Sequence, residues 1–246
     1  MHQFRKRIVR AMHLGGESKH HSIKPNFEFA SARMKQMKRE LSSQAPKFYP
    51  AIDATFEKTL ALIPKKVFQK ILEKRGQTVG EFRLDMFSKV LFMPKPWLEE
   101  MKQLLGQPSK GVVAMHYDGH FLVPSNGKHT NGTVLFSLMH EMIHGFDAIS
   151  GIKRNASSIE ALAYAAQLFS FGELISVTDA RRYAIGEGAG KEYTQGFLYG
   201  KEAADAATEI RKRGGSQKAQ TFFHRLFEMG NITSQKIEMV KRELFR

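Results

Sequence analysis

Two histidines and a glutamate lie close together in one short segment, and their types are those that bind a metal ion and move protons. The segment reads His140-Glu141-Met142-Ile143-His144. On a helix, two histidines four residues apart project to the same side about one turn apart, so both rings can ligate one ion. Glu141 directly follows the first histidine and lies beside the ion, where its carboxylate can take a proton from a bound water. The spacing predicts a hydrolytic metal centre.

The surroundings of this segment favour a metal over ordinary polar side chains. Burying two histidines and a glutamate among apolar residues is costly unless the polar groups are paired or bound to a metal. Cysteine is absent, so a transition metal must be held by nitrogen and oxygen ligands, which points to zinc. The apolar neighbours are Val134, Leu135, Leu138, Met139, Met142, Ile143 and Phe146.

A catalytic zinc usually has three protein ligands and a water, so a third ligand must come from elsewhere in the chain. Glu160 is the first candidate, because it lies on the next predicted helix after a loop long enough to reverse the chain. Alanines at 161 and 163 would let that helix pack closely against the first. Asp179, further along the chain, is the alternative third ligand.

The segment HEMIH, followed by a helix containing EALAY, resembles the gluzincin group of zinc peptidases, whose arrangement is thermolysin-like. The resemblance covers roughly residues 77–171. It implies that His140 and His144 are zinc ligands, Glu141 the general base and Glu160 the third ligand. Two related groups of zinc peptidases fit less well. A metzincin needs a histidine six positions after His144, where Ser150 stands. An aspzincin uses an aspartate further along the chain, and the segment around Asp179 is faintly similar to that pattern.

The elements that must position these residues are predicted from periodicity and turn signals. Residues 27–41 and 53–74 have helical spacing of apolar residues. Residues 77–84 alternate as a first strand, and 111–117 and 120–124 form a hairpin about Asp118-Gly119. The site helix spans about 133–149, and Ser157 or Ser158 caps a helix at 159–171. Helices at 189–213 and 218–246 complete the chain.

These elements predict an α+β fold with one principal domain. A small antiparallel or mixed sheet with its hairpin packs on the HExxH helix, and the N-terminal and C-terminal parts are mostly helical. Residues 1–26 are expected to form a basic, loosely ordered arm, residues 27–180 a zincin-like catalytic domain, and residues 181–246 a helical extension packed on that domain.

Two further roles have candidates. In peptidases of this type an edge strand lies along the cleft and binds an extended peptide by strand addition. The first strand of the hairpin is the candidate, through Ala114, Met115, His116 and Tyr117. A hydrogen-bond donor is also needed opposite the metal for the oxyanion. The candidate donors are Tyr199, Tyr183 and His224, while Tyr164 is expected to pack behind the zinc.

Composition limits the partners. Lys and Arg number 38 against 24 for Asp and Glu, which gives a net charge of +14 and attracts polyanions such as nucleic acids. No apolar run is long enough to cross a bilayer and no signal peptide is recognised, so an intracellular or virion-associated location is expected. The main hypothesis is a peptidase acting on proteins or peptides. The alternative is a basic nucleic-acid- or virion-associated binding protein with a structural or degenerate metal site.

Overall fold

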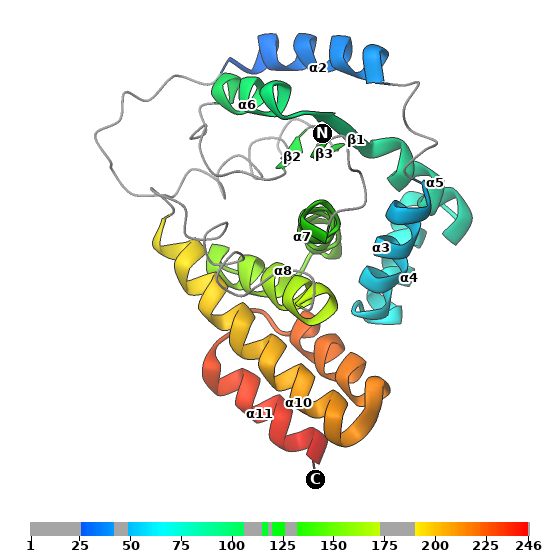
Figure 1. Cartoon of the computed structure of the whole chain (residues 1–246). Helices are drawn as coiled ribbons and strands as arrows, with labels where there is room; N and C mark the ends of the chain where they lie inside the picture. The colour runs from blue at the N-terminus through cyan, green and yellow to red at the C-terminus, as the bar shows by residue number, and fades with distance from the viewer. Residues whose placement is uncertain are drawn as a thin grey trace.

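Helices dominate the molecule and surround a small sheet (Figure 1). The computed structural model describes residues 26–41, 49–105, 115–117, 120–125, 132–172 and 190–245. The predicted α+β class, mostly helical with a small sheet, is confirmed at this level. The elements are α2 (Phe27–Leu41), α3 (Tyr49–Ala61), α4 (Lys65–Arg75), α5 (Val79–Lys89), β1 (Val90–Pro94), α6 (Lys95–Leu104), β2 (Met115–Tyr117), β3 (His120–Ser125), α7 (Gly132–Ser150), α8 (Ala156–Phe171), α10 (Lys191–Glu228) and α11 (Ser234–Phe245).

The sheet has three strands in the order β1-β3-β2. β1 runs parallel to β3, with Val90 opposite Phe121, and β2 runs antiparallel to β3, with Tyr117 opposite His120. β2 and β3 fall in the predicted hairpin, whose turn at 118–119 lies outside the described residues. β2 is therefore the outer strand on one side of the sheet.

Both faces of this sheet are covered. Successive side chains of a strand point to opposite faces, so Phe121 and Val123 enter the main core with α7, while Leu122 enters a second core. This second core lies between the sheet and the pair α2 and α6, which form the layer farthest from α8 in Figure 1. Helix α7 thus lies between the sheet on one side and α8 on the other, at the centre of the molecule.

The predicted strand at 77–84 is wrong, because α5 occupies this segment. Thr78 and Glu81 form a capping box: the Thr78 side chain accepts a hydrogen bond from the Glu81 amide, and the Glu81 carboxylate accepts one from the Thr78 amide. This reciprocal pair satisfies amides that the first turn would leave free and so starts a helix. Phe82 and Met86, four residues apart, bury one face of it. The strand lies later, at β1.

Three predicted helices differ in their limits. The helix expected over 53–74 is divided at Pro64, which is the N-cap of α4, and Gly76 ends α4 with a positive φ of 62°. Asn155, and not Ser157 or Ser158, caps α8, because its side chain accepts from the Ser158 amide. The last predicted helix is interrupted, since α10 ends at Glu228 and α11 begins only at Ser234.

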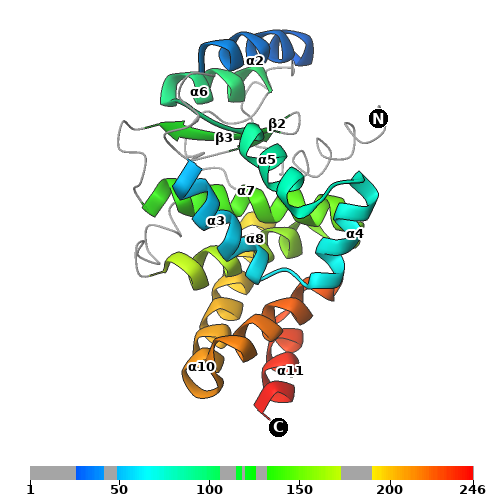
Figure 2. The same ribbon diagram turned by 90° about the vertical axis from the view of Figure 1, so that its right-hand side faces the viewer.

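Helices α8, α10 and α11 pack together below α7 (Figure 1, Figure 2). The long α10 is kinked at Gly215, whose φ of 82° and ψ of 173° are not helical. Its buried residues belong to the same core cluster as those of α7 and α8. The expected helical extension therefore shares its core with the helices that carry the predicted site. None of the helices in the described ranges has both the length and the apolar character required to cross a membrane.

Candidate metal centre

Helix α7 places the two histidines as their spacing predicts. His140 and His144 lie one turn apart, with ring centroids 4.4 Å apart and planes at 87°. Their Nε2 atoms are 2.8 Å from each other. The flanking Met139, Met142 and Ile143 are buried in the main core, so neighbouring elements pack against α7 on several sides. Both imidazoles therefore present the same ring nitrogen to one point.

Helix α8 brings Glu160 to that point. One carboxylate oxygen, Oε2, lies 3.3 Å from Nε2 of His140, and Oε1 lies 3.4 Å from Nε2 of His144. A tetrahedral zinc with bonds of about 2.0 to 2.1 Å separates its ligand atoms by roughly 3.3 Å. The two distances to Glu160 match this spacing, and the 2.8 Å between the two Nε2 atoms is shorter, so the rings would move apart when an ion binds. The three ligand atoms lie within 4.8 Å of one another. The residues fit a zinc ion held by two imidazoles and one carboxylate.

Gln167 determines which nitrogen of His140 faces this point. Its Nε2 donates to the carbonyl of Phe136 at 2.7 Å, so its Oε1 is the atom that faces Nδ1 of His140, at 2.9 Å. Nδ1 must therefore carry the hydrogen, and the lone pair on Nε2 of the neutral ring can accept from Nε2 of His144, 2.8 Å away. Buried Oε2 of Glu160 faces this lone pair and makes no hydrogen bond. A positive charge beside these two acceptors, either a metal ion or the proton on His144, offsets their repulsion.

The charges at this point are strongly coupled. Burial alone would lower the pKa of His144, but the Glu160 carboxylate outweighs it and raises that pKa to about 9. Burial would likewise raise the pKa of Glu160, but His144 and His140 hold it well below its usual range. In the absence of a metal, the proton on His144 therefore compensates the charge of Glu160.

Glu141 lies beside the ligands and is buried. Burial raises the pKa of its carboxyl above the usual range, and the nearby His140 and His144 oppose this shift. A raised pKa makes the carboxylate of Glu141 a stronger proton acceptor than an ordinary glutamate. This is the property expected of the general base.

Two tyrosines complete the surroundings. The buried ring of Tyr164 packs against that of His140, with the ring centroids 4.8 Å apart. Tyr193 lies in the first turn of α10 and is partly buried. Burial raises its pKa, and the Glu160 and Glu141 carboxylates raise it further, so its hydroxyl stays protonated as a hydrogen-bond donor. Tyr193 was not among the candidate donors chosen from the sequence.

The other predicted residues lie elsewhere or are not described. Tyr199 packs against the main core, and His224 hydrogen-bonds through Nε2 to the carbonyl of Ala61 at the end of α3. Met115, His116 and Tyr117 form β2, which contacts α7. The residues outside the described ranges are Ala114, Asp179 and Tyr183.

Gln167 and Tyr193 are the two site residues that sequence reasoning missed. Gln167 lies two turns after Glu160 within a mostly apolar stretch of α8, and this spacing places both polar side chains on the same face. That signal was available in the sequence. Tyr193 carries no comparable signal, because only the packing of α10 on α8 brings it near Glu160.

Comparison with known proteins does not place this chain in a family. No family model, curated protein or solved structure matches it.

Proposed function

We propose that this chain is a zinc-dependent metallopeptidase that hydrolyses internal peptide bonds of proteins or peptides. The observation that supports it most is the convergence of the His140, His144 and Glu160 side chains at one partly buried point, with Glu141 next to His140 on the same helix. This ligand set and its order in the chain resemble those of the gluzincins. Glu160 is therefore preferred over Asp179 as the third ligand.

The roles of the residues follow from their chemistry. A zinc ion held by these ligands would polarise the peptide carbonyl and lower the pKa of a bound water toward about 7. Glu141 takes the proton of the attacking water on its carboxylate and passes it to the departing amine. Gln167 holds His140 in the tautomer that leaves Nε2 free. The hydroxyl of Tyr193 donates a hydrogen bond to the developing oxyanion.

The substrate would bind along β2. This strand contacts the metal-bearing helix α7, and no described strand pairs with its outer side. An extended peptide can therefore add to this edge through main-chain hydrogen bonds, as peptides do in strand addition. Such binding requires an extended backbone, so unstructured protein segments are the proposed substrate class.

Exchange of Glu141 for Gln tests the proposal, because it keeps the shape of the side chain and removes the base. The variant should retain about one zinc per chain, while hydrolysis of an unfolded protein falls by roughly 10² to 10⁴. Glu73→Gln, at an exposed position on α4, is the matched control and should leave both properties unchanged. Hydrolysis that persists in Glu141→Gln would contradict the assignment.

The identity of the third ligand needs its own experiment. Zinc content measured by mass spectrometry should be lost in Glu160→Ala and kept in Asp179→Ala. The reverse result would assign the site to the aspzincin type of ligand set.

A second candidate function is supported by the charge on α4. Lys65, Lys66, Lys70 and Lys74 are exposed on this helix, and among the described residues only Lys66 of these four forms an ion pair, with Glu228 at 2.7 Å. Such a face attracts the phosphates of a nucleic acid, and the metal site would then be structural. Salt-sensitive binding of duplex DNA that is lost when these four lysines are changed to Gln, without any metal-dependent proteolysis, would favour this function over the first.

A further inference from the structure

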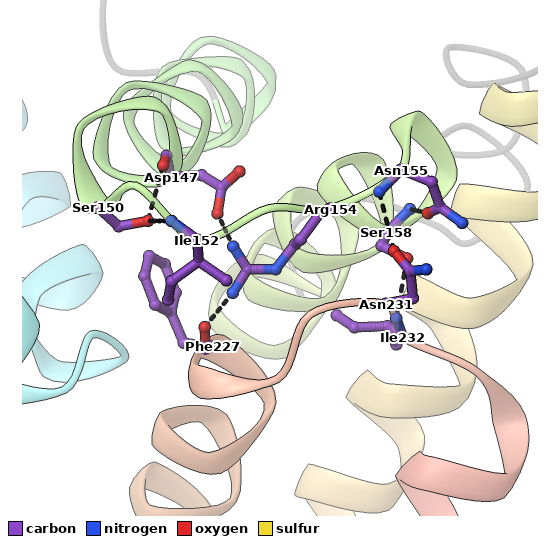
Figure 3. A network of polar contacts seen from close by, with 9 residues as sticks. All are labelled: Asp147, Ser150, Ile152, Arg154, Asn155, Ser158, Phe227, Asn231 and Ile232. Carbon is purple, nitrogen blue, oxygen red and sulfur yellow. Dashed lines mark hydrogen bonds and ion pairs between the residues drawn. The ribbon is translucent and has the colours of Figure 1, made fainter.

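The connector between α7 and α8, residues 151–155, determines how the ligands of the proposed metal centre are spaced. His140 and His144 lie before it and Glu160 lies after it. Its first residue, Gly151, has a φ of 77°, which glycine adopts without strain. Ser150 holds this turn, because its Oγ donates to the carbonyl of Asp147 at 2.8 Å and accepts from the Ile152 amide at 3.1 Å (Figure 3).

Arg154 anchors the connector from inside the protein. Its side chain is fully buried, and its guanidinium donates to the carboxylate of Asp147 and to the carbonyl of Phe227 (Figure 3). Its Cζ also lies 5.2 Å from the centroid of the Phe227 ring. A planar guanidinium can bind two acceptors at once, which a lysine cannot do with the same geometry. Arg154 thus joins α7, the connector and the end of α10.

The corner between α10 and α11, residues 229–233, holds the other side of the connector. The amide of Asn155 donates to Oδ1 of Asn231 at 2.9 Å, and the amide of Ile232 donates to Oγ of Ser158 at 2.8 Å (Figure 3). Ser158 is buried in the first turn of α8, two residues before Glu160. The corner therefore fixes the beginning of the helix that carries the third ligand.

We propose that Arg154 is a positioning residue of the metal centre, which sets the spacing between the two histidines and Glu160. It acts through Asp147, which lies on α7 three residues after His144, and through the connector on α8. The inference rests on the proposed zinc site, but it does not depend on peptidase activity. The α10–α11 corner, far from the ligands in the sequence, thereby contributes to metal affinity.

The test is the affinity for zinc of the full chain, measured by competition with a chromophoric chelator. Residues that orient metal ligands typically change metal affinity by 10-fold to 100-fold when they are replaced. Arg154→Met should weaken zinc binding by roughly tenfold or more, and Arg154→Lys should restore only part of it. Arg225→Met breaks the exposed ion pair between Arg225 on α10 and Glu243 on α11 and should leave zinc affinity unchanged. Wild-type affinity in a folded Arg154→Met protein would overturn the inference.

A double variant separates positioning from general stability. Arg154→Met leaves Asp147 as an unpaired buried charge and can fail to fold, whereas replacing both partners by apolar residues often preserves stability. In Asp147→Leu/Arg154→Met the melting temperature should recover while zinc binding remains weak. Recovery of both would show a purely structural ion pair and overturn the inference.

The two proposals fail in different ways. A wild-type protein that binds zinc but cleaves no peptide would overturn the peptidase and leave the positioning role to be decided by the affinities above. A wild-type protein that binds no zinc would overturn both.

Discussion

The imidazole of His140 donates a hydrogen bond through Nδ1 to the side-chain oxygen of Gln167, at a distance of 2.9 Å. The amide of Gln167 cannot turn over freely, because its nitrogen is bound to the carbonyl of Phe136 at 2.7 Å. One buried glutamine therefore fixes both the orientation and the tautomer of His140, a proposed metal ligand.

Replacement of Gln167 by Leu should consequently weaken zinc binding. The volume of the side chain is nearly preserved, but His140 loses its acceptor, and the carbonyl of Phe136 loses its donor. We expect the dissociation constant for zinc to rise by 10-fold to 100-fold, as measured by chelator competition. Gln69→Leu, at an exposed position on α4, should have no such effect. Equal affinities in the two variants would contradict the orienting role.

Tyr193→Phe should reduce peptide hydrolysis without changing zinc binding. The hydroxyl lies near the carboxylates of Glu160 and Glu141 and remains protonated, so it can donate to an oxyanion. Loss of one such donor typically lowers the rate by about 10² to 10³. Tyr199→Phe, six residues further along α10 and packed against the core, is the matched comparison. A larger loss of kcat/KM in Tyr199→Phe would reverse the assignment.

Zinc binding should release a proton. Burial lowers the pKa of His144 but Glu160 raises it to about 9, so below this pH the ion must displace a proton from the ring. Zinc affinity should then fall by about tenfold for each pH unit between pH 9 and pH 7. Calorimetry in buffers of different ionisation enthalpy should detect about one proton released at pH 7.5. Binding that is independent of pH in this range would contradict the coupling.

The stability of the metal-free protein should show the opposite trend with pH. Because the folded pKa of His144 is raised above its ordinary value of 6.5, the stabilisation is complete below that pH and is lost as the pH rises through about 9. The melting temperature without zinc should therefore decline over this interval. The increase in melting temperature on adding zinc should grow over the same interval. In Glu160→Gln the decline attributed to His144 should disappear.

Gly196→Ala should destabilise the protein beside Glu160, the proposed third ligand. A methyl group at position 196 would lie 2.4 Å from Cβ of Glu160 and 2.9 Å from the carbonyl oxygen of Ser157, so α10 and α8 would have to separate. We expect a loss of about 1 to 3 kcal/mol in urea denaturation, together with weaker zinc binding. Gly80→Ala meets nothing within 4 Å on α5 and should gain about 0.5 to 1 kcal/mol. Similar effects of both changes would exclude close packing as the cause.

The sequence by itself determined the features that depend on local geometry. The four-residue separation of His140 and His144 places both rings on one side of a helix whatever surrounds it, and the helix is where it was expected. The turn signals also located β2 and β3, because the strands flank a dipeptide suited to a tight turn. The error at 77–84 was avoidable, since the Thr78 and Glu81 pair is a local signal for a helix start.

Only the tertiary structure decided which distant groups meet the two histidines. Glu160 was a candidate because of its place in the chain, but its distances from both rings depend on how α8 crosses α7. Gln167, Tyr193 and Arg154 depend on the same crossing and on the packing of α10. The physical reason is that helix packing is set by many side chains and by close approaches such as that of Gly196 to Glu160. No local spacing in the sequence encodes these approaches.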